Sequence, residues 1–129
     1  MTCLAMKNNA EIKAAAVVGG ITDIEQFHNE RDERIKNMIL ELVGSDVVEW
    51  QKRSAVYWPE KINVPILILH GEDDLRVKVS QAIKLSEKLT QSGRVHELVV
   101  FPKGDHALST HKVESNKKII EWFEKYLNF

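Results

Sequence analysis

The sequence predicts an α/β fold built on a small parallel sheet. Two short runs, at 13–19 and 65–70, are apolar at consecutive positions, which is typical of strands covered on both faces. A third candidate strand occupies 96–101, and helix-like amphipathic stretches separate the three. Strands that alternate with helices form parallel sheets with right-handed crossovers. We therefore expect about three parallel strands with helices packed on the sheet.

The first half of the chain contains the end of a helix, a strand and a longer helical stretch. Residues 1–9 resemble the tail of a helix, and the strand at 13–19 ends in a glycine pair that favours a close turn. Thr22 followed by Glu25 forms a capping box ahead of a helix predicted over about 23–43, which Gly44 closes. Asp46 is expected to cap a shorter helix that ends near residue 52.

In the second half, Pro65 begins the second strand, where no ladder donor is needed. Helices are predicted over 79–92, with Gly93 at the C-terminal cap, and over about 112–127. Both have an apolar stripe at helical spacing. The stripes consist of Val79, Ala82, Ile83, Leu85 and Leu89 in the first helix, and of Ile119, Ile120, Phe123, Tyr126 and Leu127 in the second.

Length and composition bound the functional class. The 129 residues are 43% hydrophobic and 29% charged, which suits a single globular domain over 1–129. A formal net charge of -1 gives no reason to expect nucleic acid or a membrane as a partner. We expect no signal peptide, and no apolar run approaches the length of a membrane span. The single cysteine, Cys3, suits a reducing compartment, so we expect a cytoplasmic protein.

Polar residues follow the second and third strands where each strand ends. Glu72, Asp73 and Asp74 follow the run 65–70, and His106 lies in the segment after 96–101. Active groups in parallel sheets lie just past the carboxyl ends of strands, so Asp74 and His106 should lie close together. A carboxylate paired with an imidazole fixes the tautomer of the ring and stabilises its charged form. The sequence therefore predicts a catalytic pair of Asp74 and His106.

Other residues at these positions have simpler interpretations. Glu72 and Asp73 are expected to be solvated loop charges, and His70 a packed residue at the strand end. Arg76 has two open interpretations, a brace that pairs with a carboxylate near the acid and a plain surface arginine. No further ligand is spaced for a metal site, so we expect neither a metal nor a cofactor. Cys3 is interpreted as a structural thiol.

The motif His70-Gly71-Glu72-Asp73-Asp74-Leu75-Arg76-Val77 (H-G-x-x-D-x-R-V) resembles the acid-bearing segment of α/β-hydrolases, most closely the prolyl oligopeptidase family. The lead-in 53–71 and the stretch 11–23 resemble that family too, so the likeness covers nearly the whole chain. The resemblance implies a partial α/β-hydrolase fold. It also implies that Asp74 is the acid and His106 the base of a Ser-Asp-His triad.

The departure from the family concerns the nucleophile. The family places its serine in a G-x-S-x-G elbow, and the chain contains no such motif. By this resemblance, residue 1 falls just after the position of the elbow, so the oxyanion donors beside the serine are missing too. Three serines could be considered as substitutes, and each has a structural interpretation as a capping, helix-start or turn residue: Ser45, Ser80 and Ser109.

Two functions from different classes follow. The first is a serine hydrolase segment, peptidase- or esterase-like, that supplies Asp74 and His106, is inactive alone, and acts on a peptide or ester substrate when a serine-bearing segment completes it. The second is a non-catalytic protein that acts through self-association or a partner chain, because a sheet of three strands leaves an unpaired edge and an apolar face. A small nucleotide-binding domain is disfavoured, since no glycine fingerprint follows a strand.

Overall fold

A three-stranded parallel sheet forms the centre of the computed structural model, which describes residues 2–8 and 11–127. The strands are β1 (Ala15–Val18), β2 (Ile66–Gly71) and β3 (His96–Phe101), in the spatial order β1-β2-β3. Ile66 of β2 lies opposite Ala15 on one side and His96 on the other. The predicted fold class and all three strands are confirmed, with β1 shorter than the range 13–19.

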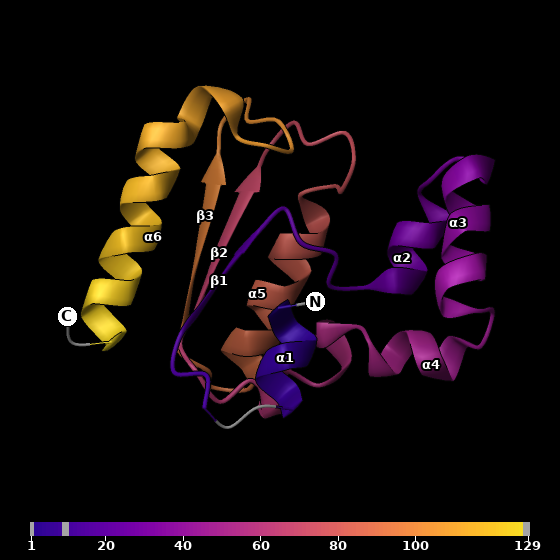
Figure 1. Cartoon of the computed structure of the whole chain (residues 1–129), viewed down its shortest axis with the longest axis horizontal. Coiled ribbons are helices and arrows are strands. Elements are labelled where there is room, and N and C mark those ends of the chain that lie inside the picture. The colour runs from indigo at the N-terminus through magenta and orange to yellow at the C-terminus, as the bar shows by residue number, and fades with distance from the viewer. Residues whose placement is uncertain (1, 9–10, 128–129) are drawn as a thin grey trace.

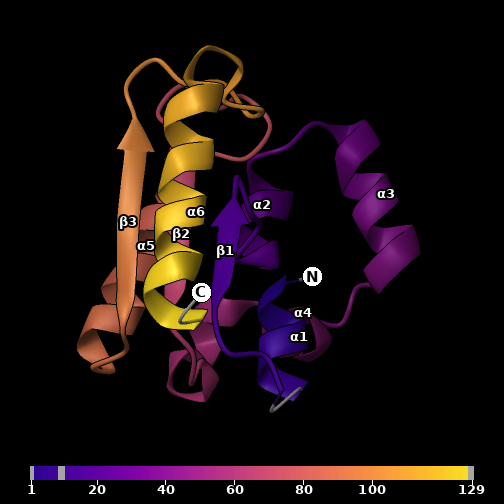
Figure 2. The same ribbon diagram turned by 60° about the vertical axis from the view of Figure 1, so that its left-hand side comes forward.

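Helices cover both faces of the sheet, as Figures 1 and 2 show. The helices α1 (Thr2–Asn8) and α5 (Ser80–Gln91) lie on one face, and α6 (Lys112–Leu127) lies on the other. The side chains of Ile66 and Ile68 pack toward α5, and those of Leu67 and Leu69 pack toward Trp122 of α6. Every residue of β2 is buried, which explains why its sequence is apolar at consecutive positions.

A lobe of three helices projects from one side of the sheet (Figure 1). It consists of α2 (Ile24–Asn29), α3 (Glu33–Val43) and α4 (Val47–Lys52), and two short 3₁₀ turns, η1 (Ala55–Tyr57) and η2 (Pro59–Lys61), lead back to β2. The lobe has its own apolar cluster, which also includes one residue from the loop after β2. The buried members are Phe27, Ile35, Ile39, Trp50 and Val77.

The single helix predicted over 23–43 is wrong, because the chain forms α2 and α3 with a break at 30–32. The carboxylate of Asp32 accepts a hydrogen bond from the backbone N–H of Ile35 at 3.0 Å and so begins a new helix. The predicted capping box is also wrong. Asp23, not Thr22, caps α2 by accepting from the backbone N–H of Gln26 at 3.1 Å.

Thr22 instead bonds to Gln81, a fully buried residue of α5. The side-chain oxygen of Gln81 accepts from the backbone N–H groups of Thr22 and Asp23, each at 2.8 Å. Its side-chain nitrogen donates to the carbonyl oxygen of Asp23 at 3.0 Å. The Gln81 amide thus satisfies the backbone where the chain leaves β1, as a buried polar group must.

The remaining helix predictions are largely confirmed. Gly44 ends α3 with φ 81°, and Asp46 caps α4 through the backbone N–H of Val48. The helices α5 and α6 lie where the stripes predict them, although Ile83 and Ile120 are 40% and 57% exposed rather than buried. The predicted helix tail at 1–9 corresponds to α1, and residues 1 and 9 lie outside the described residues. No helix in the described part of the chain combines the length and apolarity needed to cross a bilayer.

Candidate active site

The carboxyl ends of β2 and β3 bring two loops together. We call residues 72–78 the acid loop and residues 102–108 the base loop. The Nδ1 atom of His106 lies 2.8 Å from Oδ2 of Asp74, although 32 residues separate them in the sequence. Each residue follows a strand, and the two strands are hydrogen-bonded neighbours. The structure therefore brings together the two residues that the sequence singles out, and places them within hydrogen-bonding distance.

The carboxylate of Asp74 is buried and fully partnered. Its side chain is 0% exposed. Its Oδ1 atom accepts hydrogen bonds from the backbone N–H groups of Arg76 at 2.8 Å and Val77 at 2.9 Å. Because these two bonds fix the plane of the carboxylate, Oδ2 is left facing the imidazole of His106. A buried carboxylate is stable only with such partners.

A second imidazole approaches the same carboxylate oxygen. The Nε2 atom of His70, on β2, lies 2.7 Å from the carbonyl oxygen of Val77 and 3.3 Å from Oδ2 of Asp74. A carbonyl oxygen can only accept, so Nε2 of His70 carries a proton. His70 is 1% exposed, as its prediction as a packed residue requires. Its contact with Asp74 was not predicted, although the four-residue spacing in the motif was visible.

The ring of His106 is oriented for proton transfer through its other nitrogen. An ionised Asp74 accepts the Nδ1 proton, so Nε2 of neutral His106 has a free lone pair. Among residues 2–8 and 11–127, no group hydrogen-bonds to Nε2 of His106. The His106 side chain is 36% exposed and lines a cavity of about 470 Å³. A base that faces a cavity while its partner is buried can exchange protons with a ligand.

Backbone hydrogen bonds join the acid loop to the base loop. The N–H of Glu72 donates to the carbonyl oxygen of Phe101 at 3.0 Å, and the N–H of Asp73 donates to that of Gly104 at 2.9 Å. The side chains of Glu72 and Asp73 are exposed, as predicted for solvated charges. These two residues therefore contribute through their backbone, by holding the loops in register.

Glycines permit this close approach. A Cβ atom on Gly71 would lie 2.3 Å from the carbonyl oxygen of Asp105, which is closer than side chains ever come to backbone. A Cβ atom on Gly19, after β1, would lie 3.0 Å from Cε1 of His106, and Gly19 also has φ +59°. The turn after β1 thus lies close to the His106 ring, and a side chain at residue 19 would be both strained and crowded.

The base loop is ordered by its own contacts. Asp105 accepts hydrogen bonds from the hydroxyl and the backbone N–H of Ser109, which lower the pKa of its carboxyl. Leu108 is 1% exposed and adopts the left-handed conformation with φ 54°. A buried, apolar residue in this sparsely populated region is held there by its surroundings. The side chains of Asp105 and Leu108 thus fix the segment on both sides of His106.

The residues considered as substitute nucleophiles have structural roles. Ser109 donates its hydroxyl proton to Asp105, and Ser80, at the start of α5, accepts from the side chain of Gln26 at 2.9 Å. Ser45 is exposed between α3 and α4. Burial raises the pKa of the Cys3 thiol to about 11, which favours the unreactive protonated form.

The side chain of Arg76 fits the interpretation as a surface arginine, and the residue supports the site through its main chain. Its side chain is exposed, and within the described ranges it forms no ion pair with a carboxylate. Its carbonyl oxygen accepts a hydrogen bond from the guanidinium of Arg31, which ties the helical lobe to the acid loop. Arg76 therefore braces Asp74 through its main chain. Arg31 and Arg34, which line the same cavity, were not singled out from the sequence.

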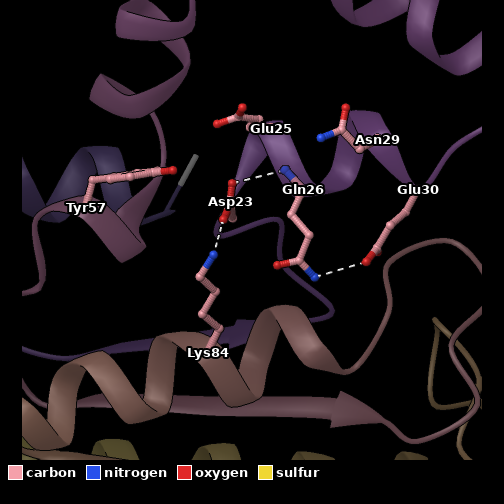
Figure 3. A pocket seen from close by; sticks show the side chains of 7 residues that line it. All are labelled: Asp23, Glu25, Gln26, Asn29, Glu30, Tyr57 and Lys84. Carbon is pink, nitrogen blue, oxygen red and sulfur yellow. Dashed lines mark hydrogen bonds and ion pairs between the residues drawn. The ribbon is translucent and has the colours of Figure 1, made fainter.

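A second hollow lies on another side of α2 (Figure 3). Lys84 extends from α5 and pairs with the buried carboxylate of Asp23, which raises the pKa of Lys84. Glu25 and Glu30 also line this hollow, and Glu30 accepts from the side chain of Gln26 at 3.2 Å. The hollow shares no lining residue with the cavity at His106. Across residues 2–8 and 11–127, no group of three or more His, Cys, Asp or Glu side chains is arranged to hold a metal ion.

Comparisons with known proteins give the family. A model of the prolyl oligopeptidase family matches residues 1–129. The chain is 30% identical over 113 residues to the uncharacterized peptidase YuxL of Bacillus subtilis, with 84% of this chain and 16% of YuxL covered. It is 31% identical over 113 residues to the uncharacterized peptidase YtmA of the same organism, with 84% of this chain and 42% of YtmA covered.

Solved structures show the same fold. The uncomplexed acylaminoacyl peptidase of Pyrococcus horikoshii superposes with a TM-score of 0.88 at 23% identity, over 98% of this chain and 22% of that one. The chain therefore spans less than half the length of each of these relatives. It belongs to the prolyl oligopeptidase family and corresponds to a C-terminal part of that family's α/β-hydrolase fold.

Proposed function

We propose that this chain supplies the acid and the base of a Ser-Asp-His triad in a peptidase-like serine hydrolase. In this proposal His106 is the general base and Asp74 orients it. The observation that carries the proposal is the 2.8 Å contact between Nδ1 of His106 and the buried carboxylate of Asp74, with the partly exposed His106 side chain lining a cavity. Membership of the prolyl oligopeptidase family supports it.

The proposed mechanism assigns one role to each group. A serine hydroxyl attacks the carbonyl carbon of a peptide or ester, and Nε2 of His106 takes the hydroxyl proton. The resulting imidazolium is stabilised by Asp74 and passes the proton to the leaving amine or alcohol. Water then hydrolyses the acyl-serine, with His106 again accepting and returning a proton. His70 and the backbone of Arg76 and Val77 hold Asp74 in place throughout.

The serine in this mechanism comes from outside residues 1–129, since the sequence contains no G-x-S-x-G elbow. We therefore infer that the chain alone has no hydrolase activity, and that a serine-bearing segment completes the site. Peptide and ester substrates both fit the mechanism. The single cysteine, which has no partner for an internal disulfide, supports a reducing compartment such as the cytoplasm.

Labelling with a fluorophosphonate, which reacts only with an activated serine, tests the proposal. The chain alone should not be labelled. A chimera in which this chain replaces the matching region of YuxL should be labelled. His106→Ala in the folded chimera should reduce labelling by about 10³-fold or more, because the serine loses its base. His28→Ala, which changes a half-buried histidine of α2 that does not line the cavity, should leave it unchanged. Labelling that survives the loss of His106 would refute the assignment.

A second candidate, non-catalytic association, is favoured by one apolar hollow. A cavity of about 260 Å³ lies between α1 and the helical lobe, and Ile21, Met38 and Leu42 at its rim are 44%, 43% and 74% exposed. Exposed apolar side chains gathered around a hollow are typical of protein contacts. Under this candidate the chain forms a dimer or binds a partner chain, and Leu42→Lys should abolish a dimer seen by sedimentation equilibrium. A chain that stays monomeric at high concentration contradicts self-association.

A further inference from the structure

The cavity at His106 is lined by an unusual concentration of positive charge. Three guanidinium groups contribute to it: Arg31 after α2, Arg34 at the start of α3, and Arg76 of the acid loop. The cavity is about 470 Å³, and no Asp or Glu side chain lines it. Three arginines that line one hollow give it a positive potential, so the hollow favours an anion over a neutral ligand.

Two carboxylates near the cavity are engaged by other groups. Asp32 caps α3, and Glu33 pairs with Lys36 at 3.9 Å. Asp73 and Asp105 line an adjoining hollow, which shares Arg76 and His106 with the cavity. In the described part of the chain, no carboxylate oxygen lies within 4.0 Å of a guanidinium nitrogen of the three arginines.

The guanidinium groups differ in their freedom. Arg31 donates to the carbonyl oxygen of Arg76, and its guanidinium lies 5.5 Å from the ring centre of Phe27. These two contacts fix the position of the Arg31 guanidinium at the side of the cavity. Arg34 and Arg76 are exposed, and neither side chain has a hydrogen-bond partner among the described residues. Two free forked donors beside a fixed one can bind a carboxylate through paired hydrogen bonds.

We propose that the arginine cavity binds a carboxylate of the substrate, close to the bond at which His106 acts. The carboxylate belongs either to the C-terminus of a peptide or to an Asp or Glu side chain. His106 lines the same cavity, so the anion lies within about one or two residues of the scissile bond, at roughly 3.5 Å per residue. This inference rests on the proposed function and adds a substrate class to it.

Peptide binding to the isolated chain tests the proposal without turnover. Three probes differ in whether they carry a carboxylate and where it lies: acetyl-tetraalanine amide, acetyl-tetraalanine acid, and acetyl-Ala-Ala-Asp-Ala amide. Their dissociation constants can be measured by titration of the ¹⁵N-labelled chain by NMR. At least one of the two acidic peptides should bind about tenfold or more tightly than the neutral one. Tighter binding of the free acid indicates recognition of a C-terminus, and tighter binding of the aspartyl peptide indicates recognition of a side chain.

Charge-neutralising variants locate the site. Arg34→Gln and Arg76→Gln should each weaken binding of the preferred acidic peptide roughly three- to tenfold and leave the neutral peptide unchanged. Lys61→Gln removes the same charge from exposed η2, before the opposite end of β2, and should change nothing. Equal affinity for all three probes overturns the proposal. An equal loss in Lys61→Gln also overturns it, because the attraction then depends on net charge alone.

The low-field proton resonance of His106 Nδ1–H, measured in the same samples, separates this inference from the proposed function. If the resonance shows the bond to Asp74 and the peptides bind without charge preference, the arginine site fails and the triad proposal stands. If the preference is present and the Asp74 bond is absent, the triad proposal fails and the anion site stands.

Discussion

His106 and Asp74 form a hydrogen bond of 2.8 Å in which one partner is buried and the other lines a cavity. Asp74→Asn keeps the shape of the side chain but removes its charge, so the amide can no longer fix the Nδ1 tautomer. We expect the low-field Nδ1–H resonance of His106 to disappear in this variant. Asp73→Asn, one residue away and exposed, should keep it. An unchanged resonance in Asp74→Asn would show that the pair does not form in solution.

His70 should matter for stability as well as for the site. His70→Phe leaves the buried carbonyl oxygen of Val77 without its donor, which should lower the free energy of unfolding by about 2 kcal/mol. His28→Phe replaces a partly exposed ring beside Trp50. This change should alter the free energy of unfolding by less than about 0.5 kcal/mol. Urea denaturation measures both. Equal effects of the two changes would mean that the buried hydrogen bond of His70 does not contribute to the free energy of unfolding.

Gly71 should tolerate no side chain. Its added Cβ would meet the base-loop backbone at 2.3 Å, so Gly71→Ala should destabilise the protein by about 2 kcal/mol or more and separate the two loops. Gly93→Ala is the matched control, since Gly93 has φ +65° and open space around its Cα. It should cost about 1 kcal/mol through backbone conformation alone. Only Gly71→Ala should abolish the His106 resonance; its survival there would contradict the close approach.

Much of the site could be predicted because the chain alternates strands and helices. Once 65–70 and 96–101 are neighbouring parallel strands, Asp74 and His106 must emerge at one edge of the sheet. The contacts of His70 and Arg31 could not be predicted in this way. Arg31 meets the carbonyl of Arg76 across 45 residues of sequence, and its position depends on how the helical lobe packs.

The errors in the helix predictions have a common physical cause. Short polar side chains compete for the same backbone N–H groups. Sequence spacing does not say which of these side chains caps the helix. Thr22 fits a capping box, but a buried glutamine 59 residues away binds it, and Asp23 caps the helix instead. Asp32 then begins a second helix within a stretch that has no apolar residue between Phe27 and Ile35.

Cys3 should react slowly at ordinary pH. Burial raises its pKa from 9.0 to about 11, so the thiolate fraction at pH 8 should be about 100-fold lower than in an unfolded chain. Alkylation by iodoacetamide at pH 8, with and without urea, measures this difference. Because the folded state holds the proton more tightly, stability should fall as the pH rises from about 9 toward 11. Equal alkylation rates with and without urea would contradict the burial.

Ser109 should control the carboxyl of Asp105. The hydrogen bonds from Ser109 lower the pKa of Asp105, so Ser109→Ala should raise that pKa toward its ordinary value. A lowered pKa stabilises the folded state above the unfolded pKa, and this stabilisation is lost as the pH falls through the folded value. The stability difference between wild type and Ser109→Ala should therefore shrink in acid. NMR titration of the Asp105 carboxyl measures the direction of the pKa change. Thr110→Ala is the control and should leave the pKa of Asp105 unchanged.

The buried amide of Gln81 also limits how this sheet can grow. Because its oxygen accepts from both backbone N–H groups at 22 and 23, neither group is free to pair with another strand beyond β1. An incoming strand could add along the outer edge of residues 15–18, which is open among the described residues, but its ladder would have to stop before Thr22. β-Augmentation beside β1 is therefore confined to a segment of about four residues, too short for an extended fibril-like contact.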